Sequence, residues 1–156
     1  PHIRRISYMQ MHKKTLLFLC TGNTCRSPMA EDLFRMETND SEAYLVNSSG
    51  LSTQNGLCAS ENAILAMKEL GRDISGHRSS ILDKKLVSES DIVLTMTEAH
   101  RQMAIALFPE LREKICRLDP LHNIEDPYGG DLNVYKRCRN QIHTAIRKMI
   151  SELGKF

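Results

Sequence analysis

The sequence predicts a single-domain α/β fold in which helices cover both faces of a central, four-stranded parallel sheet, an arrangement of three layers. Apolar segments of strand length alternate along the chain with segments whose apolar residues recur at helical intervals, a pattern typical of parallel sheets. The length of 156 residues suits one domain with a substantial core. The chain contains no internal repeat, low-complexity tract or linker that would divide it.

Four short segments are the predicted strands, because they are rich in apolar residues and end at polar or turn-forming ones. They cover residues 16–19, 43–47, 91–96 and 114–118. Parallel strands need crossover connections, which are almost always right-handed and usually contain a helix. Ligands of such sheets bind at the carboxyl ends of the strands, so we expect the functional site there.

The first helix is predicted to begin directly after residue 26. Ser27 is a good N-cap, and Pro28 suits the first helical position, where its missing N–H would be unpaired in any case. The apolar residues that follow have the spacing of one helical face, and they are Met29, Ala30, Leu33 and Phe34.

Three further helices are predicted downstream. Ser60 can cap the second helix, which Gly71 stops. The third helix covers residues 98–107 and ends before Pro109. Residues 119–130 are rich in Pro, Gly, Asn and Asp and predict a loop, after which a long terminal helix carries apolar residues at helical intervals.

Composition excludes several classes of function. The formal net charge of +2 is too small, and the basic residues too scattered, to indicate nucleic acid as a partner. No apolar stretch approaches a membrane span, so no membrane partner is expected. Five cysteines at irregular spacing make no disulfide framework, which favours the reducing cytoplasm. Residues 1–12 lack the apolar core of a signal peptide and are interpreted as a leader or tag-derived segment.

Residues 16–28 are the most informative segment of the chain. An apolar run ends at Cys20, a loop with Gly22 and Asn23 follows, and Arg26 precedes the expected helix. A loop between a strand end and a helix N-terminus points backbone N–H groups inward, and the helix dipole adds positive potential. Gly22 and Asn23 tolerate the left-handed backbone that such an anion nest needs. The segment therefore predicts a phosphate-binding loop after the first strand.

Two side chains of this loop suit phosphate chemistry. The Arg26 guanidinium is a planar fork that can bind two phosphate oxygens. Cys20 lies among N–H groups and positive charge, which favour a nucleophilic thiolate, and the Ser27 hydroxyl can donate to the same sulfur. An isolated strand-end cysteine is more often a small buried hydrophobe. The arginine six positions later and the Gly-Asn loop between them favour the nucleophile.

The segment Cys20-Thr21-Gly22-Asn23-Thr24-Cys25-Arg26-Ser27-Pro28 closely resembles the signature of low-molecular-weight cysteine phosphatases. That family contains protein tyrosine phosphatases and, in some bacteria, protein arginine phosphatases. Its second signature, an Asp-Pro-Tyr loop, is matched by Asp126-Pro127-Tyr128, and the resemblance covers about residues 14–153. It implies a phosphatase domain over residues 13–156, with phosphorylated proteins as substrates, inorganic phosphate as product, and neither a metal nor another cofactor.

The resemblance also implies a role for each site residue. Cys20 would attack phosphorus and form a cysteinyl-phosphate, while Arg26 and the loop amides stabilise the equatorial oxygens. Asp126 would protonate the leaving group and then activate water, with Glu125 and Asp131 as weaker candidates and an ordinary turn as the alternative. The remaining residues expected around the phosphate are Thr21, Gly22, Asn23, Thr24, Cys25 and Ser27 in the loop, and Tyr128 as a wall of the pocket.

Three further residues have weaker assignments. Ser48 and His77 match family positions that support the loop through Asn23 and Ser27, although His77 could equally be an ordinary surface histidine. Cys25 lies close to Cys20 in a tight loop. It could form a disulfide that protects Cys20 from over-oxidation, or simply pack at the start of the helix.

The resemblance slightly favours phosphoarginine over phosphotyrosine as substrate. Tyrosine phosphatases of the family usually carry a bulky aliphatic residue where this chain has Thr24, whereas arginine phosphatases carry Thr there. Gly129 replaces a second aromatic residue of many tyrosine-directed members, and Thr97 replaces an acidic residue of some. The Thr24 hydroxyl can hydrogen-bond a guanidinium, while its methyl group still narrows the pocket.

Two functions of other classes stay open. An arsenate reductase can use a similar loop, but it needs further cysteines that relay a disulfide, and Cys58, Cys116 and Cys138 are widely separated and interpreted as structural. Their spacing is also not that of a zinc site. A catalytically idle phosphate-binding or redox-sensing module is supported only by Cys25.

Overall fold

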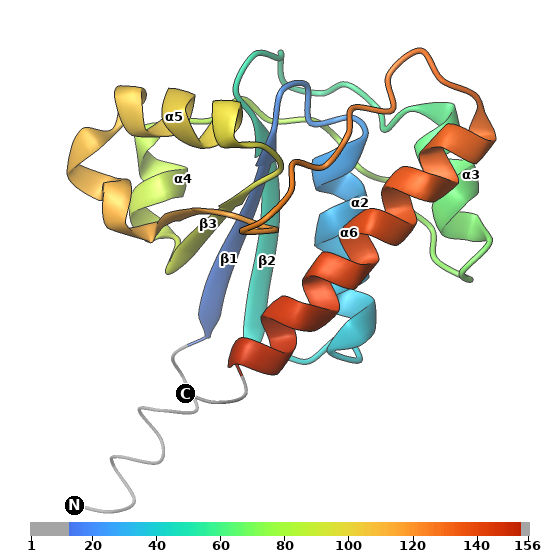
Figure 1. Cartoon of the computed structure of the whole chain (residues 1–156), viewed down its shortest axis with the longest axis horizontal. Coiled ribbons are helices and arrows are strands. Elements are labelled where there is room, and N and C mark those ends of the chain that lie inside the picture. The colour runs from blue at the N-terminus through green and yellow to red at the C-terminus, as the bar shows by residue number, and fades with distance from the viewer. Residues whose placement is uncertain (1–12, 154–156) are drawn as a thin grey trace, which may run out of the picture.

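The structure is a computed structural model of the chain, and it describes residues 13–153. These residues form three layers, with a parallel sheet between two layers of helices (Figure 1). This arrangement is the predicted single-domain α/β fold. The interpretation of residues 1–12 as a leader lies outside the described residues and stays a prediction.

All four predicted strands are present in the sheet. They are β1 (Lys14–Cys20), β2 (Tyr44–Gly50), β3 (Ile92–Thr95) and β4 (Ile115–Arg117), all parallel and in the order β2-β1-β3-β4. The chain moves from β1 to β2 on one side and later to β3 on the other, so the strand order reverses at β1. Ligands bind beyond the carboxyl ends of strands at such switch points, which is where Cys20 lies.

Helices cover both faces of the sheet (Figure 1). On one face lie α2 (Arg26–Glu37), α3 (Glu61–Lys68) and α6 (Leu132–Leu153), and on the other α4 (Lys84–Glu89), α5 (Glu98–Leu107) and the 3-10 helix η1 (Pro109–Lys114). The four predicted helices are confirmed, α5 with the predicted bounds. The sequence did not predict α4 because its six residues contain a single buried side chain, Val87.

Strand β1 explains why the first apolar run has no alternation of polar and apolar residues. Leu16, Phe18 and Cys20 pack into the core beneath α2, α3 and α6, whereas Leu17 and Leu19 pack into the core beneath α4 and α5. Because both faces of the strand are buried, every residue from 16 to 20 must be apolar or nearly so. The two cores hold the end of β1, and with it Cys20, in a fixed position.

The start of helix α2 differs from the prediction. The helix begins at Arg26, Cys25 occupies the N-cap position, and no side chain makes a cap hydrogen bond. Ser27 is thus the second helical residue rather than the N-cap, and its hydroxyl bonds inside the preceding loop. Pro28 is still compatible with the helix, because N–H groups of the first turn have no partner within the helix.

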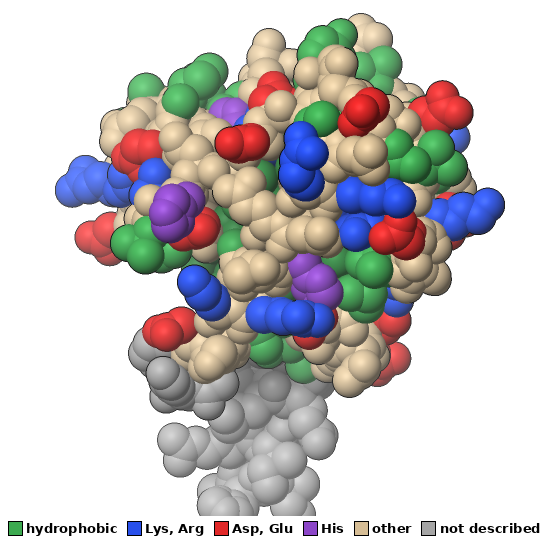
Figure 2. All heavy atoms as spheres, turned by 45° about the vertical axis from the view of Figure 1, so that its right-hand side comes forward, with side chains coloured by type: hydrophobic (Ala, Val, Ile, Leu, Met, Phe, Trp, Pro, Cys, Tyr) green, Lys and Arg blue, Asp and Glu red, His purple; other side chains and the backbone are tan. Residues whose placement is uncertain are grey.

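The charged side chains are mixed on the surface. Figure 2 shows lysines and arginines interspersed with aspartates and glutamates over the visible face, without a basic stripe among the residues drawn in colour. Within residues 13–153, no helix has the length and apolar character needed to cross a membrane.

Candidate active site

The candidate site is a pocket beyond the carboxyl end of the sheet, to which the segments after β1 and β4 contribute. It has a volume of about 270 Å³ and is lined by Cys20, Thr21, Gly22, Thr24, Cys25, Arg26, Asp126 and Tyr128. The structure therefore brings together the phosphate-binding loop and the Asp-Pro-Tyr loop, which lie about a hundred residues apart in the sequence.

The Cys20 sulfur lies at the base of this loop, where it accepts hydrogen bonds. Its side chain is 3% exposed. The backbone N–H of Asn23 donates to Sγ at 3.3 Å, and Ser27 Oγ lies 2.9 Å from Sγ. Ser27 Oγ accepts a hydrogen bond from Asn23 Nδ2 at 2.8 Å, and its own hydrogen can point at the sulfur, which is nearer than its other acceptor, the Ser49 carbonyl at 3.5 Å. Such donors stabilise a thiolate relative to a thiol.

Asn23 holds the loop in shape through all of its polar atoms. Its φ of 57° is the left-handed conformation expected for an anion nest. Nδ2 also donates to Ser48 Oγ at 3.0 Å, Oδ1 accepts from the Ser80 N–H at 2.9 Å, and the backbone carbonyl accepts from His77 Nε2 at 2.7 Å. Of the two loop residues that tolerate this conformation, Asn23 adopts it and Gly22 does not.

Ser48 and His77 both contact Asn23, which agrees with the proposed support of the loop. Neither is seen bonded to Ser27, so the support of Ser27 passes through Asn23. Glu31 of α2, which the sequence analysis missed, completes the network: Ser48 Oγ donates to its Oε2 at 3.0 Å, and His77 Nδ1 lies 3.9 Å away. A carboxylate that accepts the Ser48 hydrogen leaves Ser48 Oγ to accept from Asn23.

Gly50 is a second residue that the sequence analysis missed. It ends β2 and pairs with Cys20 in the sheet. A Cβ at this position would lie 2.7 Å from the Thr21 carbonyl oxygen and 3.1 Å from Asn23 Cβ. Only glycine therefore lets β2 pass so close to the loop, and no local pattern in the sequence could indicate this long-range contact.

Arg26 connects the two loops of the pocket. Its guanidinium is buried, donates from Nη1 to the Ile124 carbonyl at 3.0 Å, and places Nη2 3.6 Å from Asp126 Oδ2. The Asp126 side chain is 59% exposed and also accepts from the Tyr128 N–H at 3.1 Å. Tyr128 is 83% exposed and stands at the rim of the pocket.

The two rival carboxylates do not line the pocket. Asp131 Oδ1 accepts from the Val134 N–H at 3.0 Å and so caps the start of α6. Glu125 is exposed, and its N–H donates to the Gln141 side chain at 3.3 Å. Asp126 is thus the carboxylate that shares the pocket with Cys20.

Cys25 packs at the start of α2, as one of its two interpretations requires. Its sulfur lies 3.3 Å from Ser60 Oγ and 3.4 Å from the Tyr135 hydroxyl, and burial raises the pKa of Tyr135 to about 12. Ser60 and Tyr135 were not expected near the site. Cys20 and Cys25 are both free cysteines in the structure. The disulfide between them stays a prediction.

The three residues used to discriminate between substrates have different positions. Thr24 is half-buried and lines the pocket, so it can contact a substrate. Gly129 follows the exposed Tyr128 and has a φ of 80°, which favours glycine for reasons of backbone alone. Thr97 caps α5 by accepting from the His100 N–H at 3.0 Å, and it is absent from the residues that line the pocket. Of the three residues, Thr24 is therefore the one in a position to contact a substrate.

His100 is a further residue that the sequence analysis missed. It lies in the first turn of α5, is 5% exposed, and its Nε2 lies 2.8 Å from Thr21 Oγ1. Burial, reinforced by the Arg26 guanidinium and opposed by Asp126, lowers the pKa of His100 to about 4. The imidazole is therefore neutral at physiological pH. A lone histidine in a helical segment carries no sequence signal for such a contact.

Because His100 is buried and neutral, we expect the folded protein to lose stability in acid. In the unfolded chain it takes up a proton near pH 6.5, whereas in the folded protein it does so only near pH 4, so the free energy of unfolding falls between these two values. We expect His100→Gln to remove about 3 kcal/mol of the difference in stability between pH 7.5 and pH 4. Urea unfolding at both pH values measures this difference. The exposed His122→Gln is the matched control, and an equal acid loss in both variants would contradict the prediction.

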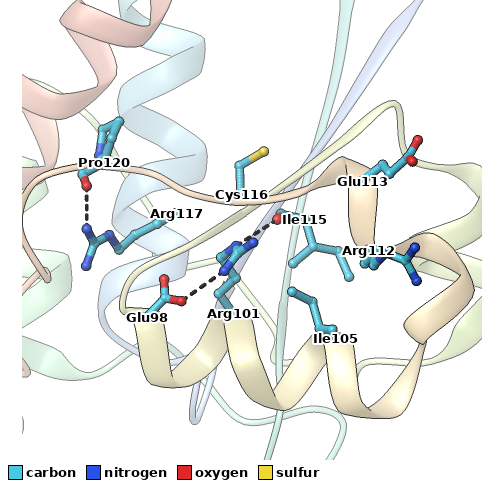
Figure 3. Close-up of a pocket in the computed structure, with 9 residues that line it drawn as sticks. All are labelled: Glu98, Arg101, Ile105, Arg112, Glu113, Ile115, Cys116, Arg117 and Pro120. Carbon is cyan, nitrogen blue, oxygen red and sulfur yellow. Dashed lines mark hydrogen bonds and ion pairs between the residues drawn. The ribbon is translucent and has the colours of Figure 1, made fainter.

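A larger cavity of about 620 Å³ lies between α5, η1 and β4 (Figure 3). Several of its polar groups already have partners in the protein. Arg101 contacts Glu98 Oε1 at 2.9 Å and donates to the Ile115 carbonyl at 3.2 Å, and Arg117 donates to the Pro120 carbonyl. The cavity shares no lining residue with the Cys20 pocket. It is therefore separate from the candidate active site.

Comparison with known proteins agrees with this geometry. Residues 15–156 match the family described as low molecular weight phosphotyrosine protein phosphatase. The chain belongs to this family. A protein-arginine-phosphatase of Geobacillus stearothermophilus is 37% identical over 143 residues, which cover 88% of this chain and 95% of that relative. The protein-arginine-phosphatase of Bacillus subtilis is 34% identical, and the match covers 90% of this chain and 97% of that relative.

Solved structures of the family share the fold closely. A low molecular weight protein tyrosine phosphatase from T. tengcongensis has a TM-score of 0.85 and 35% identity, covering 90% of this chain and 99% of its own. A mutant of YwlE arginine phosphatase with a phosphorylated active-site serine also has a TM-score of 0.85. Its sequence is 32% identical, and the match covers 90% of this chain and 96% of that structure's chain.

Arsenate reductases are also relatives. Arsenate reductase 2 of Staphylococcus haemolyticus is 36% identical over 136 residues, which cover 87% of this chain and 95% of that protein. The other cysteines here lie apart from the pocket: Cys58 on an exposed loop, Cys116 in β4 and Cys138 in α6. Burial raises the pKa of Cys138 to about 12, so it is a protonated, poorly nucleophilic thiol. The exposure of Cys58 does not support the structural role that was expected for it.

Proposed function

We propose that this chain is a cysteine-dependent protein phosphatase that hydrolyses phosphoproteins through a cysteinyl-phosphate intermediate. The observation that carries the proposal is the Cys20 sulfur, which receives hydrogen bonds from the loop in a pocket that Arg26 and Asp126 also line. Family membership supports the reaction class. The solved relative with a phosphorylated active-site serine is in keeping with a phosphoryl group on the nucleophile.

In the first step, the Cys20 thiolate attacks phosphorus and a sulfur–phosphorus bond replaces the bond to the leaving group. The N–H groups of the loop and the Arg26 guanidinium neutralise the charge on the equatorial oxygens. Asp126 is the proton donor to the departing atom, because it is the carboxyl group that faces the same pocket.

In the second step, water attacks the cysteinyl-phosphate. The Asp126 carboxylate, left after the first step, takes a proton from that water, and inorganic phosphate and the thiolate are released. The loop supplies the positive field throughout, so these residues require no metal ion. We place the reaction in the cytoplasm, where free cysteines such as Cys20 and Cys25 persist.

We infer that phosphoarginine is favoured over phosphotyrosine. Thr24 lines the pocket, and its hydroxyl oxygen lies 3.7 Å from the Cys25 sulfur, so the hydroxyl can accept from the guanidinium of phosphoarginine. Phosphotyrosine offers no N–H donor there. Two of the relatives are protein-arginine-phosphatases, which supports this preference.

Exchange of Thr24 tests the substrate. We expect the ratio of kcat/KM for a phosphoarginine peptide to that for a phosphotyrosine peptide to fall about tenfold in Thr24→Ile, because a hydrogen-bonding donor of the substrate loses its partner. Thr144→Ile, the same change on the exposed face of α6, is the matched control and should leave the ratio unchanged. A strong preference of the unmodified protein for phosphotyrosine would refute the inference while leaving the phosphatase activity in place.

Arsenate reduction is the second candidate function, favoured by the relatives that bear that name. It would require a disulfide relay from Cys20, for which the separate positions of Cys58, Cys116 and Cys138 give no support. Arsenate-dependent oxidation of thioredoxin by the purified chain would establish it.

A further inference from the structure

His100 reaches the phosphate-binding loop from the layer of α4 and α5, opposite the layer of α2 (Figure 1). Its backbone is fixed, because Thr97 Oγ1 accepts from its N–H and the neighbouring Arg101 bonds to Glu98 and to β4 (Figure 3). Its buried ring places Nε2 2.8 Å from Thr21 Oγ1. Thr21 follows Cys20 directly and lines the pocket.

The other ring nitrogen of His100, Nδ1, indicates which of the two atoms donates this hydrogen bond. A neutral imidazole has one N–H donor and one acceptor. Among the described residues, Nδ1 of His100 is buried without a hydrogen-bond partner. A hydrogen on Nδ1 would create a buried N–H without an acceptor, which is rare in native proteins. The hydrogen is therefore on Nε2, and His100 donates to the Thr21 oxygen.

We propose that His100 is a positioning residue that turns the Thr21 hydroxyl into a hydrogen-bond donor for the phosphoryl group. Since Thr21 Oγ1 accepts from His100, its own hydrogen can point into the pocket and bind an anionic oxygen. With the opposite polarity, the Thr21 hydrogen would be directed at the ring and an oxygen lone pair would face the anion. The assignment of the bound group as phosphoryl rests on the proposed function.

The first test is the protonation state of the ring in the full chain. Long-range ¹⁵N–¹H NMR at pH 7 should show the His100 hydrogen on Nε2 and a bare Nδ1. A hydrogen on Nδ1 would overturn the proposal, whatever the behaviour of any variant. This measurement requires neither turnover nor a substitution, so it decides the point even where a variant fails to fold.

The second test is the affinity of the full chain for inorganic phosphate, measured by calorimetry. We expect Kd to rise about tenfold in Thr21→Val, because a hydrogen bond to a charged group is lost, and to a similar extent in His100→Asn, whose amide is too short to reach Thr21. His100→Gln keeps an N–H at the distance of Nε2 and should stay within about twofold of the original Kd. The double variant Thr21→Val/His100→Asn should be no weaker than Thr21→Val alone.

Unchanged phosphate affinity in His100→Asn, or losses that multiply in the double variant, would overturn the role of His100. These outcomes are separable from failure of the proposed function. A chain that binds phosphate with this dependence on His100 but hydrolyses no phosphopeptide would refute the phosphatase and retain the positioning role. A chain that hydrolyses phosphopeptides, but whose affinity for phosphate does not depend on His100, would refute the positioning role and retain the phosphatase.

Discussion

Cys20→Ser is expected to reduce hydrolysis of para-nitrophenyl phosphate by about 10³-fold or more, because a serine hydroxyl is not ionised by the donors that stabilise a thiolate. Ser27 Oγ and the Asn23 N–H, which lie 2.9 Å and 3.3 Å from the sulfur, would then face a neutral oxygen. The rate of release of para-nitrophenol measures the loss.

The controls separate loss of the nucleophile from loss of the fold. Cys58→Ser makes the same chemical change on an exposed loop and should retain full activity. Cys20→Ser should still bind inorganic phosphate, since the loop amides and Arg26 are untouched. Retention of more than a tenth of the activity in Cys20→Ser would exclude a cysteinyl-phosphate as an obligatory intermediate.

Asp126→Asn is expected to reduce kcat by about 10²–10³-fold on substrates whose leaving group needs a proton, because an amide cannot act as a general acid. The loss should depend on the leaving group. It should be large for phenyl phosphate and several-fold smaller for para-nitrophenyl phosphate, whose phenolate leaves without assistance. Steady-state kinetics on both esters measures the contrast.

Glu125→Gln is the matched control for this prediction. Glu125 precedes Asp126 but is exposed and absent from the residues that line the pocket, so its variant should retain activity within about twofold. An equal loss on both esters in Asp126→Asn would instead indicate that Asp126 acts by orienting Arg26, which lies 3.6 Å away.

The strongly local features of the molecule were predictable from the sequence. Four strands, the long helices and the loop that begins at Cys20 depend on neighbours along the chain, and α5 was predicted with its observed bounds. The prediction was wrong where a tertiary contact outweighed a local preference of the sequence. Ser27 has the chemistry of an N-cap, but its hydroxyl bonds to the Cys20 sulfur and to Asn23 instead. The left-handed backbone of the loop, by contrast, lies at Asn23, one of the two residues that the sequence indicated for it.

The sequence by itself brought together Cys20, Asn23 and Arg26, which carry much of the proposed chemistry, because one short loop connects the end of β1 to the start of α2. Only the tertiary structure decided what surrounds them. Gly50 approaches the loop from β2, and His100 reaches Thr21 across 79 residues of chain. Such contacts depend on which strand ends become neighbours when the sheet forms, and no periodicity along the chain records that arrangement.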